Sequence, residues 1–347
     1  ACMQEKALRL SVAGPVLVSG AAYFVAAIAS MAIARLPEGI SALWLANAVA
    51  VGLLLRAPRA AWLPALVAIM VAGVLAGGIM FRFSIVAVLL TAIDVLEIII
   101  ALILITRWCG PSVRFESNVF DYFKTLLAAA LIGPVLGGVL ATAVLTTLNG
   151  VAPAEAFDNW VTGSALGALL ILPLILSSSR KAVQEAVTGH RGLEFAAITA
   201  AIVVGAYVAV STVTFSFVVV AFAMALAATR LGPFPTAVIT AAAFSTMLVA
   251  GIVSGFASGP VATNLTLSTA HITASITLVA PFTISLLFAK MHADRARLVD
   301  SEQRFRQAMQ HSAIGMALVG LDGRWIQMNP ALCAMLGYSE AELQKLT

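Results

Sequence analysis

Charged residues are scarce in this sequence. Only 10% of its 347 residues are Asp, Glu, Lys or Arg, whereas 61% are hydrophobic. A soluble globular protein has roughly 25% charged and 45–50% apolar residues, so water cannot be the solvent for most of this chain. The abundance of aliphatic side chains also excludes a disordered or collagen-like polymer. Because a membrane-spanning helix needs about 20 mostly apolar residues, the composition predicts an all-α polytopic protein whose main partner is the lipid bilayer.

Cysteine pairs and phosphate-binding loops are also lacking. The three cysteines, Cys2, Cys109 and Cys333, have no spacing typical of a metal site or a disulfide framework. No GxxxxGK[ST] loop is present. We therefore expect no metal site, no cofactor and no catalytic residue in this segment. The net charge of +4 fits basic loops beside anionic headgroups, and no nucleic-acid partner is predicted.

Long apolar runs between charged or Pro/Gly-marked breaks predict about ten transmembrane helices. They lie near residues 8–34, 40–55, 60–81, 83–105, 119–148, 160–179, 193–212, 215–231, 233–256 and 264–289. The second and eighth runs are short for a full crossing. The first run is too long for the core of a cleavable signal and is followed by further spans, so no removable leader is expected.

Basic residues gather in alternate loops between these runs. With an even number of spans and both termini cytoplasmic, the inner loops and flanks contain Lys6, Arg9, Arg56, Arg59, Arg107, Arg114, Lys124, Arg180, Lys181, Arg191, Arg230, Lys290, Arg295 and Arg297. The opposite side contains only Arg35 and Arg82. Because Lys and Arg are retained in cytoplasmic loops, this asymmetry favours ten spans with both termini inside.

The composition changes sharply at Lys290, after which the chain is polar and helix-prone. Met291, Leu298 and Phe305 recur every seven residues, which is the spacing of a coiled-coil seam. One interpretation is a parallel signalling helix that transmits motion across a dimer. The other is an ordinary amphipathic connector.

A short pattern of soluble character follows this connector. The expected elements are a strand over 315–319, a hairpin turn at Asp322-Gly323, a strand over 325–328, a helix that starts at Asn329-Pro330 and ends at Gly337, and a second helix opened by a Ser339/Glu342 capping box. About 45 residues cannot bury a core of their own. We therefore expect this segment to be the first part of a larger domain.

Two stretches of the sequence carry resemblances to known families. The piece SAIGMALV, with the DG turn, NPAL and LGYSEAEL after it, resembles the first half of a PAS domain, an α/β fold. The motifs LWLANAVAVGLLL, AIDVLEIIIALIL and WVTGSALGALLILPLIL resemble the first class of membrane-associated sensor domains, MASE1. The predicted organisation is a cytoplasmic tail at 1–7, a MASE-type transmembrane domain at 8–289, a helical connector at 290–300 and an incomplete PAS domain at 301–347.

A MASE1 unit followed by PAS resembles the membrane-bound MASE–PAS–GGDEF(–EAL) diguanylate cyclases. The resemblance implies a homodimeric sensor in the bacterial inner membrane that responds to an unknown small-molecule or protein ligand. Its output domain, expected beyond residue 347, would use GTP and Mg to make cyclic di-GMP. Two alternatives remain open: an input module of a sensor histidine kinase, and, in a different class, a secondary transporter.

Ionisable residues inside hydrocarbon are costly and mark candidate sites. Asp94 and Glu97 lie three residues apart on one face of the fourth predicted helix, where burial and mutual repulsion oppose ionisation of both carboxyl groups. They either form a switch or ligand contact, or a structural hydrogen-bonded cluster. Asn47 is a candidate for either role. His271 would become functional only if it met the acidic pair, and is otherwise structural.

Two further features of the sequence bear on a possible site and on helix packing. Asp158, Asn159 and Trp160 lie at a predicted outer boundary, where they either rim an outward-facing pocket or act as ordinary interfacial residues. GxxxG pairs occur at Gly73/Gly77, Gly133/Gly137, Gly163/Gly167, Gly251/Gly255 and Gly255/Gly259. These pairs predict close helix packing, either within one chain or between two copies.

Overall fold

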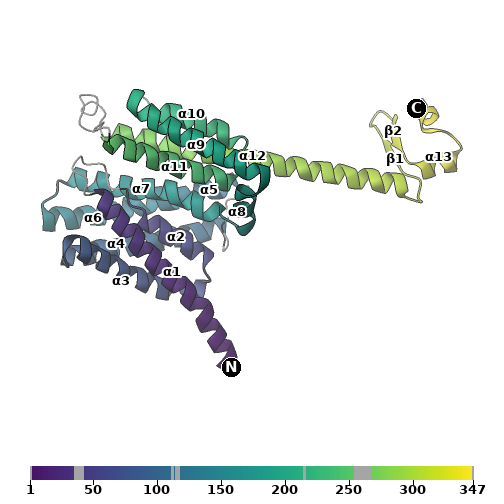
Figure 1. The fold of residues 1–347 in the computed structure, drawn as a ribbon. Coiled ribbons are helices and arrows are strands. Elements are labelled where there is room, and N and C mark those ends of the chain that lie inside the picture. The colour runs from purple at the N-terminus through teal and green to yellow at the C-terminus, as the bar shows by residue number, and fades with distance from the viewer. Residues whose placement is uncertain are drawn as a thin grey trace. The chain divides into compact units, whose positions relative to one another are not determined.

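The computed structural model describes residues 2–34, 43–110, 113, 118–213, 216–253 and 267–345. The chain divides into two compact units, Ala1–Ala289 and Lys290–Thr347. The described part of the first unit is helical, and the second contains a two-stranded sheet with short helices (Figure 1). This is the predicted class, an all-α membrane part and a fragment of an α/β fold.

Helices follow one another along the first unit, and the last of them continues into the second. They are α1 (Cys2–Ala34), α2 (Ala46–Arg56), η1 (Arg59–Ala61), α3 (Trp62–Phe81), α4 (Ile85–Cys109), α5 (Val119–Leu126), the π-helical segment η2 (Leu127–Ile132), α6 (Gly133–Asn149), α7 (Pro153–Ser177), α8 (Arg180–Val187), α9 (Gly189–Thr212), α10 (Ser216–Ala228), α11 (Pro233–Val253) and α12 (Leu267–His311). Each predicted apolar run overlaps one of these helices or, for 119–148, the continuous run α5–η2–α6. Within the described residues, 7 helical runs are long and apolar enough to cross a membrane. The shorter apolar helices α2 and α10 match the two runs marked as short.

Two details of the helices differ from the sequence prediction. Helix α7 begins at Pro153 rather than near 160, because proline suits the first helical position and polar residues are tolerated in a first turn. Helix α8 was not predicted, since it is short and polar and leaves no apolar run. Its start is capped by Ser179, whose Oγ accepts from the N–H of Ala182 at 3.1 Å.

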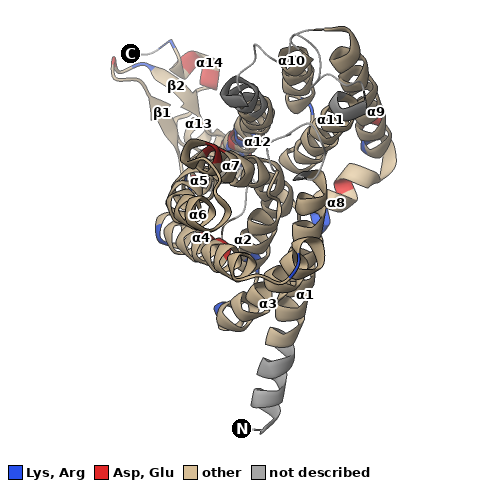
Figure 2. Ribbon diagram, turned by 90° about the vertical axis from the view of Figure 1, so that its left-hand side faces the viewer, with Lys and Arg blue, Asp and Glu red and all other residues tan. Residues whose placement is uncertain are grey.

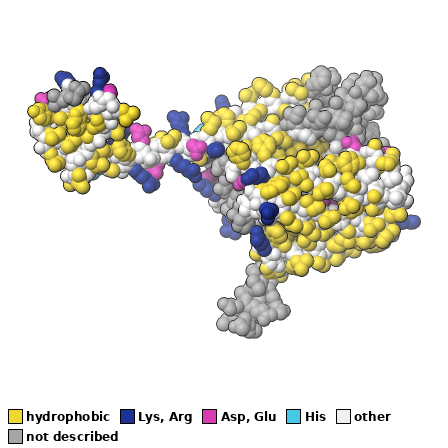
Figure 3. Space-filling model, turned by 180° about the vertical axis from the view of Figure 1, so that it is seen from behind, with side chains coloured by type: hydrophobic (Ala, Val, Ile, Leu, Met, Phe, Trp, Pro, Cys, Tyr) yellow, Lys and Arg dark blue, Asp and Glu magenta, His cyan; other side chains and the backbone are white. Residues whose placement is uncertain are grey.

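Apolar side chains cover the outside of the bundle as well as its interior. Figure 3 shows hydrophobic side chains over most of the visible face of the bundle. Leu63, Ile79 and Phe222 are among the exposed apolar residues of this unit. Lys, Arg, Asp and Glu are sparse along its helices (Figure 2). An apolar exterior of this extent needs lipid around it. The chain is therefore a multi-pass membrane protein.

Glycines let the helices of this unit approach closely. A Cβ added at Gly137 on α6 would lie 3.0 Å from both Glu97 Oε2 and Trp160 Nε1, and one at Gly167 on α7 would overlap the carbonyl oxygen of Trp44. A Cβ at Gly73 on α3 would collide with the side chain of Thr91. These members of the first three GxxxG pairs thus pack within one chain. The last two pairs share Gly255, which lies outside the described residues.

Two clusters of buried apolar side chains hold the bundle together. One joins α1–α5, η2, α7, α11 and α12, and the other joins α9, α10 and α11. On α12, the Phe282 ring centroid is 5.0 Å from that of Tyr122 on α5. Ser285 Oγ of the same helix donates to the carbonyl of Leu231 at 3.1 Å. The membrane part of α12 is therefore anchored in the core.

The π-helical segment η2 has a local cause in Pro134. Proline has no N–H, and its ring clashes with the carbonyl four residues earlier, so one regular α-helical hydrogen bond is lost at this point. A widened turn accommodates the defect. Gly133 beside it packs against α4, since a Cβ added there would lie 3.2 Å from Glu97 Cγ.

The second unit contains the predicted hairpin. Strands β1 (Ala317–Val319) and β2 (Trp325–Met328) pair antiparallel, with Ala317 opposite Met328. Gly323 has φ +83° in the turn, a conformation that favours glycine. The turn and both strands are confirmed, although β1 is shorter than the predicted run 315–319.

The helices after the hairpin are also the predicted ones. Helix α13 (Pro330–Leu336) is capped by Asn329, whose Oδ1 accepts from the N–H of Leu332 at 2.9 Å and from that of Met316 at 2.8 Å. Gly337, with φ +76°, ends this helix. The Ser339/Glu342 capping box opens α14 (Glu340–Leu343).

Beyond Lys290, α12 is solvent-exposed over most of its length to His311, with Met309 buried. Met291, Leu298 and Phe305 are 63%, 71% and 47% exposed. Ion pairs within this helix join Asp294 to Arg297, Asp300 to Arg304 and Glu302 to Arg306. The three apolar side chains at seven-residue spacing are thus uncovered.

Candidate functional site

The acidic pair of α4 lies inside the bundle. Asp94 and Glu97 are each only 3% exposed. Helix α4 begins at Ile85 after Ser84, whose Oγ accepts from the N–H of Ala87 at 3.2 Å. From this start, both carboxyl groups come to face neighbouring helices. The Asn47 side chain interacts with both, but their other partners differ.

Asp94 joins α4 to the first two helices. Its Oδ1 accepts from Asn47 Nδ2 at 2.9 Å, and its Oδ2 accepts from the Tyr23 hydroxyl at 3.2 Å. The indole N–H of Trp44 donates to Asn47 Oδ1 at 3.1 Å. Both oxygens of the carboxyl group thus act as acceptors, and both donors are neutral.

Glu97 instead joins α4 to α7. Its Oε2 accepts from Trp160 Nε1 at 3.2 Å and lies 3.5 Å from Ser164 Oγ. The absence of a side chain at Gly137 leaves the space in which Glu97 and Trp160 meet. This second carboxyl group is a buried link between helices.

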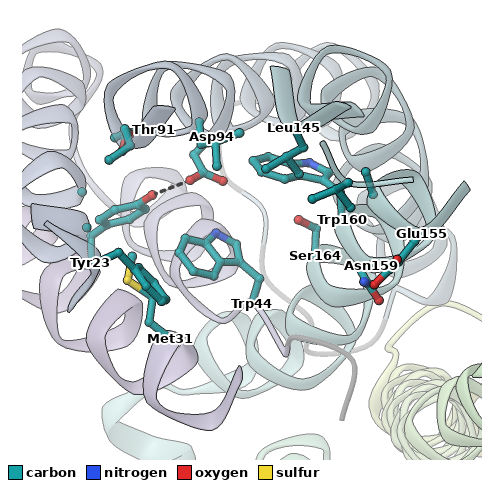
Figure 4. A pocket seen from close by; sticks show the side chains of 17 residues that line it. Tyr23, Met31, Trp44, Thr91, Asp94, Leu145, Glu155, Asn159, Trp160 and Ser164 are labelled. Atoms are coloured by element: carbon teal, nitrogen blue, oxygen red, sulfur yellow. Dashed lines mark hydrogen bonds between the residues drawn. The ribbon is translucent and has the colours of Figure 1, made fainter. Parts of the chain in front are cut away.

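A cavity of about 420 Å³ opens beside the Asp94 group. It is lined by Tyr23, Met31, Trp44, Gly73, Gly77, Phe81, Ala87, Leu90, Thr91, Asp94, Leu145, Val151, Glu155, Ala156, Asn159, Trp160 and Ser164. In Figure 4 the Tyr23 hydroxyl points to Asp94, the rings of Trp44 and Trp160 both border the cavity, and Glu155 and Asn159 lie together at one side. Its volume is in the range of small-molecule sites, roughly 300–1,000 Å³.

Only some of the predicted site residues lie at the cavity. Asn47 and Asp94 meet directly, whereas Glu97 is not a lining residue of the cavity. At the predicted outer rim, Asn159 and Trp160 line the cavity and Asp158 does not. His271 belongs to α12, but its side chain lies outside the described residues.

Sequence reasoning did not single out Tyr23, Trp44 or Ser164 as members of the site. Tyr23 is one of 4 tyrosines in the chain and the only one in its apolar run, and a phenol in hydrocarbon needs a hydrogen-bond partner. That signal was available, although it does not name Asp94, which is 71 residues away. Trp44 and Ser164 carry no comparable signal.

The arrangement of the described residues is suited to binding a ligand rather than to holding a metal ion. Among the described residues, no cluster of three or more His, Cys, Asp or Glu side chains is placed to hold a metal ion. The cavity combines one buried carboxyl group with aromatic and aliphatic walls. Such a combination is suited to recognition.

Comparisons with known proteins agree with this architecture. The family model described as MASE1 matches residues 15–292, and one described as a PAS domain matches residues 303–347. A protein of Escherichia coli (strain K12) named "Probable diguanylate cyclase DgcE" is 26% identical over 336 residues, which cover 94% of this chain and 29% of that protein. The chain therefore spans less than a third of the length of this curated relative. No solved structure matches. The MASE1 match covers most of the chain, and the chain belongs to the MASE1 family, with a PAS domain following at residues 303–347.

Proposed function

We propose that this chain is the sensory input module of a membrane-bound diguanylate cyclase. The observation that carries the proposal is the order of its parts, a MASE1 domain followed by PAS, which aligns with a relative named as a diguanylate cyclase. The membrane unit would receive a signal. An output domain outside residues 1–347 would join two GTP molecules into cyclic di-GMP, with Mg as its metal.

Helix α12 is the proposed route for the signal. It runs over 45 residues and has Pro281 inside it. Leu278, Phe282 and Leu286 bury its early part in the membrane core. A shift or rotation of this buried part would be carried along a continuous helix. The residues assigned to the PAS domain begin on the same helix.

We further propose that the chain acts as a homodimer through the stripe Met291, Leu298 and Phe305. These exposed side chains have the seven-residue spacing of a parallel coiled coil. Joining two GTP molecules requires two GTP-loaded domains to face one another. A change in the pairing of two α12 helices is therefore a direct means of control.

The proposed setting is the bacterial inner membrane, with both termini cytoplasmic. The asymmetry of Lys and Arg between alternate loops supports this orientation. It places the PAS domain and the output domain in the compartment that contains GTP. It also places the turns at 82–84 and 150–152, near the lining residues Phe81 and Val151, on the outer side.

Insertions between Lys290 and Ser301 test the proposal. One to seven residues are inserted into the full-length protein, and cyclic di-GMP is quantified in cells that otherwise make none. Insertions of one to four residues should change the output because they rotate the apolar stripe, whereas seven residues, about two helical turns, should restore it. Arg297→Ala, which leaves the helical phase intact, should behave as the unaltered protein.

The outcomes separate the proposal from its alternatives. Output that is indifferent to every insertion contradicts transmission through α12. Phosphate transfer to a partner protein without cyclic di-GMP would identify a sensor kinase instead. A secondary transporter would accumulate solute in proteoliposomes, and the buried carboxyl group beside a cavity is the observation that makes this measurement worthwhile.

A further inference from the structure

The cavity beside Asp94 has the features of a binding site for one class of ligand. We infer that it binds a small organic cation, an amine with an apolar body, whose nitrogen pairs with Asp94. Binding of this cation does not require the output domain. The inference rests on the proposed function in one respect only, that the cavity is where the signal is received.

The charge of the cavity selects for a cation. Asp94 is only 3% exposed, and Tyr23 and Asn47, which donate to its two oxygens, are neutral. None of the ion pairs found among the described residues involves Asp94. A carboxylate taken out of water without a cation is unfavourable, and a bound ammonium group would offset that cost.

The other ionisable residue that lines the cavity is also acidic. Glu155 is a second acidic lining residue, and no Lys, Arg or His occurs among the described residues that line the cavity. An anionic ligand would therefore meet negative charge without compensation. An inorganic cation is not favoured, since the described residues include no cluster of three metal-ligating side chains.

The walls are suited to an apolar or aromatic body. Trp44 and Trp160 already donate their indole N–H groups to Asn47 and Glu97, and each indole has only one such donor. What these tryptophans offer a ligand is ring surface. Ring faces of Trp and Tyr attract a cation as well as apolar groups, and Met31 and Leu145 extend the apolar lining.

Access and size are consistent with a small molecule. The lining includes Phe81 at the end of α3 and Val151 between α6 and α7, so the cavity reaches the side of the bundle at which these helices turn. The volume of about 420 Å³ is large enough for a ring with a short aminoalkyl chain and too small for a folded protein segment.

Binding of chosen probes to the purified chain in lipid nanodiscs tests this inference. The cationic probes are phenethylamine and hexylamine. The neutral probe is 2-phenylethanol and the anionic probe is phenylacetate, which have the same ring as phenethylamine. Isothermal titration calorimetry should show saturable binding of a cationic probe at least about tenfold tighter than of either counterpart, as expected for a charge-assisted pair in a low-dielectric site.

Two variants locate the interaction. Asp94→Asn keeps the shape of the side chain and should remove the preference for the amine, while Leu145→Trp should block the cavity and weaken all probes without touching Asp94. Glu185→Gln, on α8 and paired with Lys181, is the matched control and should bind as the unaltered chain. Circular dichroism of each variant verifies its helix content, and if Asp94→Asn does not fold, Leu145→Trp alone decides.

Specific results would overturn the inference. In the unaltered chain these are no binding of either amine up to millimolar concentration, equal binding of phenethylamine and 2-phenylethanol, or tighter binding of phenylacetate. In the variants they are an amine preference that survives in a folded Asp94→Asn protein, or an unchanged affinity in a folded Leu145→Trp protein. The proposed function fails separately. Amine binding without any change in cyclic di-GMP from the full-length protein would leave the ligand site standing and remove its role in signalling.

Discussion

The side-chain amide of Asn47 donates to Asp94 Oδ1 at 2.9 Å and thereby joins the first turn of α2 to the middle of α4. The orientation of this amide is set by Trp44, whose indole N–H donates to Asn47 Oδ1 at 3.1 Å. An amide nitrogen and an indole nitrogen can only donate hydrogen bonds. The hydrogen bonds from Trp44 to Asn47 and from Asn47 to Asp94 therefore all run in one direction. It is a polar link between helices in a region that lipid surrounds.

Replacement of Asn47 tests the strength of this link. Asn47→Leu should lower the free energy of unfolding by about 1–2 kcal/mol, because Asp94 remains buried with one donor fewer. The measurement is unfolding in mixed micelles followed by circular dichroism. Thr147→Val is the control, since the exposed Thr147 hydroxyl donates only to carbonyls of its own helix. Equal loss of stability in both variants would contradict the assigned role.

Because Gly167 lies against the Trp44 carbonyl, adding a single methyl group at this position should lower the stability of the bundle. Gly167→Ala should lower stability by about 1–3 kcal/mol or more, because the added Cβ must displace backbone. Gly205→Ala on α9 is the matched control, since nothing lies within 4 Å of its Cβ position. It should be neutral or stabilising by up to about 1 kcal/mol. Thermal melting in detergent distinguishes the two, and similar melting temperatures would argue against close packing at Gly167.

Cysteine cross-linking tests the proposed pairing of two α12 helices. In isolated membranes treated with a mild oxidant such as copper phenanthroline, Leu298→Cys should form an intermolecular disulfide readily, because the seam places two copies of this position close together. Val299→Cys, one residue further and also exposed, should react at least about fivefold more slowly because it lies roughly 100° around the helix. Cys109 and Cys333 are replaced by Ser, and Cys2 likewise, to remove background. Comparable rates at both positions would rule out a parallel seam along this stripe.

Asn329 connects the hairpin to α13 in the second unit, and its replacement should destabilise this unit. It is only 1% exposed, and besides capping α13 it donates from Nδ2 to the carbonyl of Ile314 at 2.8 Å. Asn329→Ala should weaken the hairpin–helix connection by about 1–2 kcal/mol, since it removes a cap and leaves part-buried backbone groups without their side-chain partner. Asn329→Asp keeps the acceptor and should cost less. Hydrogen exchange of residues 314–336 measures the difference, with indistinguishable exchange in the two variants as the contrary result.

Much of the local structure follows from short stretches of the sequence. The hairpin turn, the start of α13 at Pro330 and the capping box at Ser339 were each predicted from two to four adjacent residues. Their conformations depend on backbone preferences and nearby hydrogen bonds. Neighbouring residues are therefore sufficient to specify them.

The candidate site was predicted only in part. The cost of a carboxyl group in hydrocarbon marked Asp94 and Glu97, and Asn47 was marked beside a motif. Their partners were not assigned, since Tyr23 lies 71 positions from Asp94 and Trp160 lies 63 positions from Glu97. Contacts between such distant positions depend on how the helices pack.

The sequence by itself determined that this chain crosses a membrane as many helices and where those helices lie. The reason is that hydrocarbon requires long apolar segments with all backbone groups bonded internally. Only the tertiary structure decided that Asp94 faces a cavity while Glu97 ties α4 to α7. That division depends on the rotation of each helix against its neighbours and on glycines such as Gly137, which admit one side chain and exclude another. Two carboxyl groups alike in sequence thus have different surroundings in the folded chain.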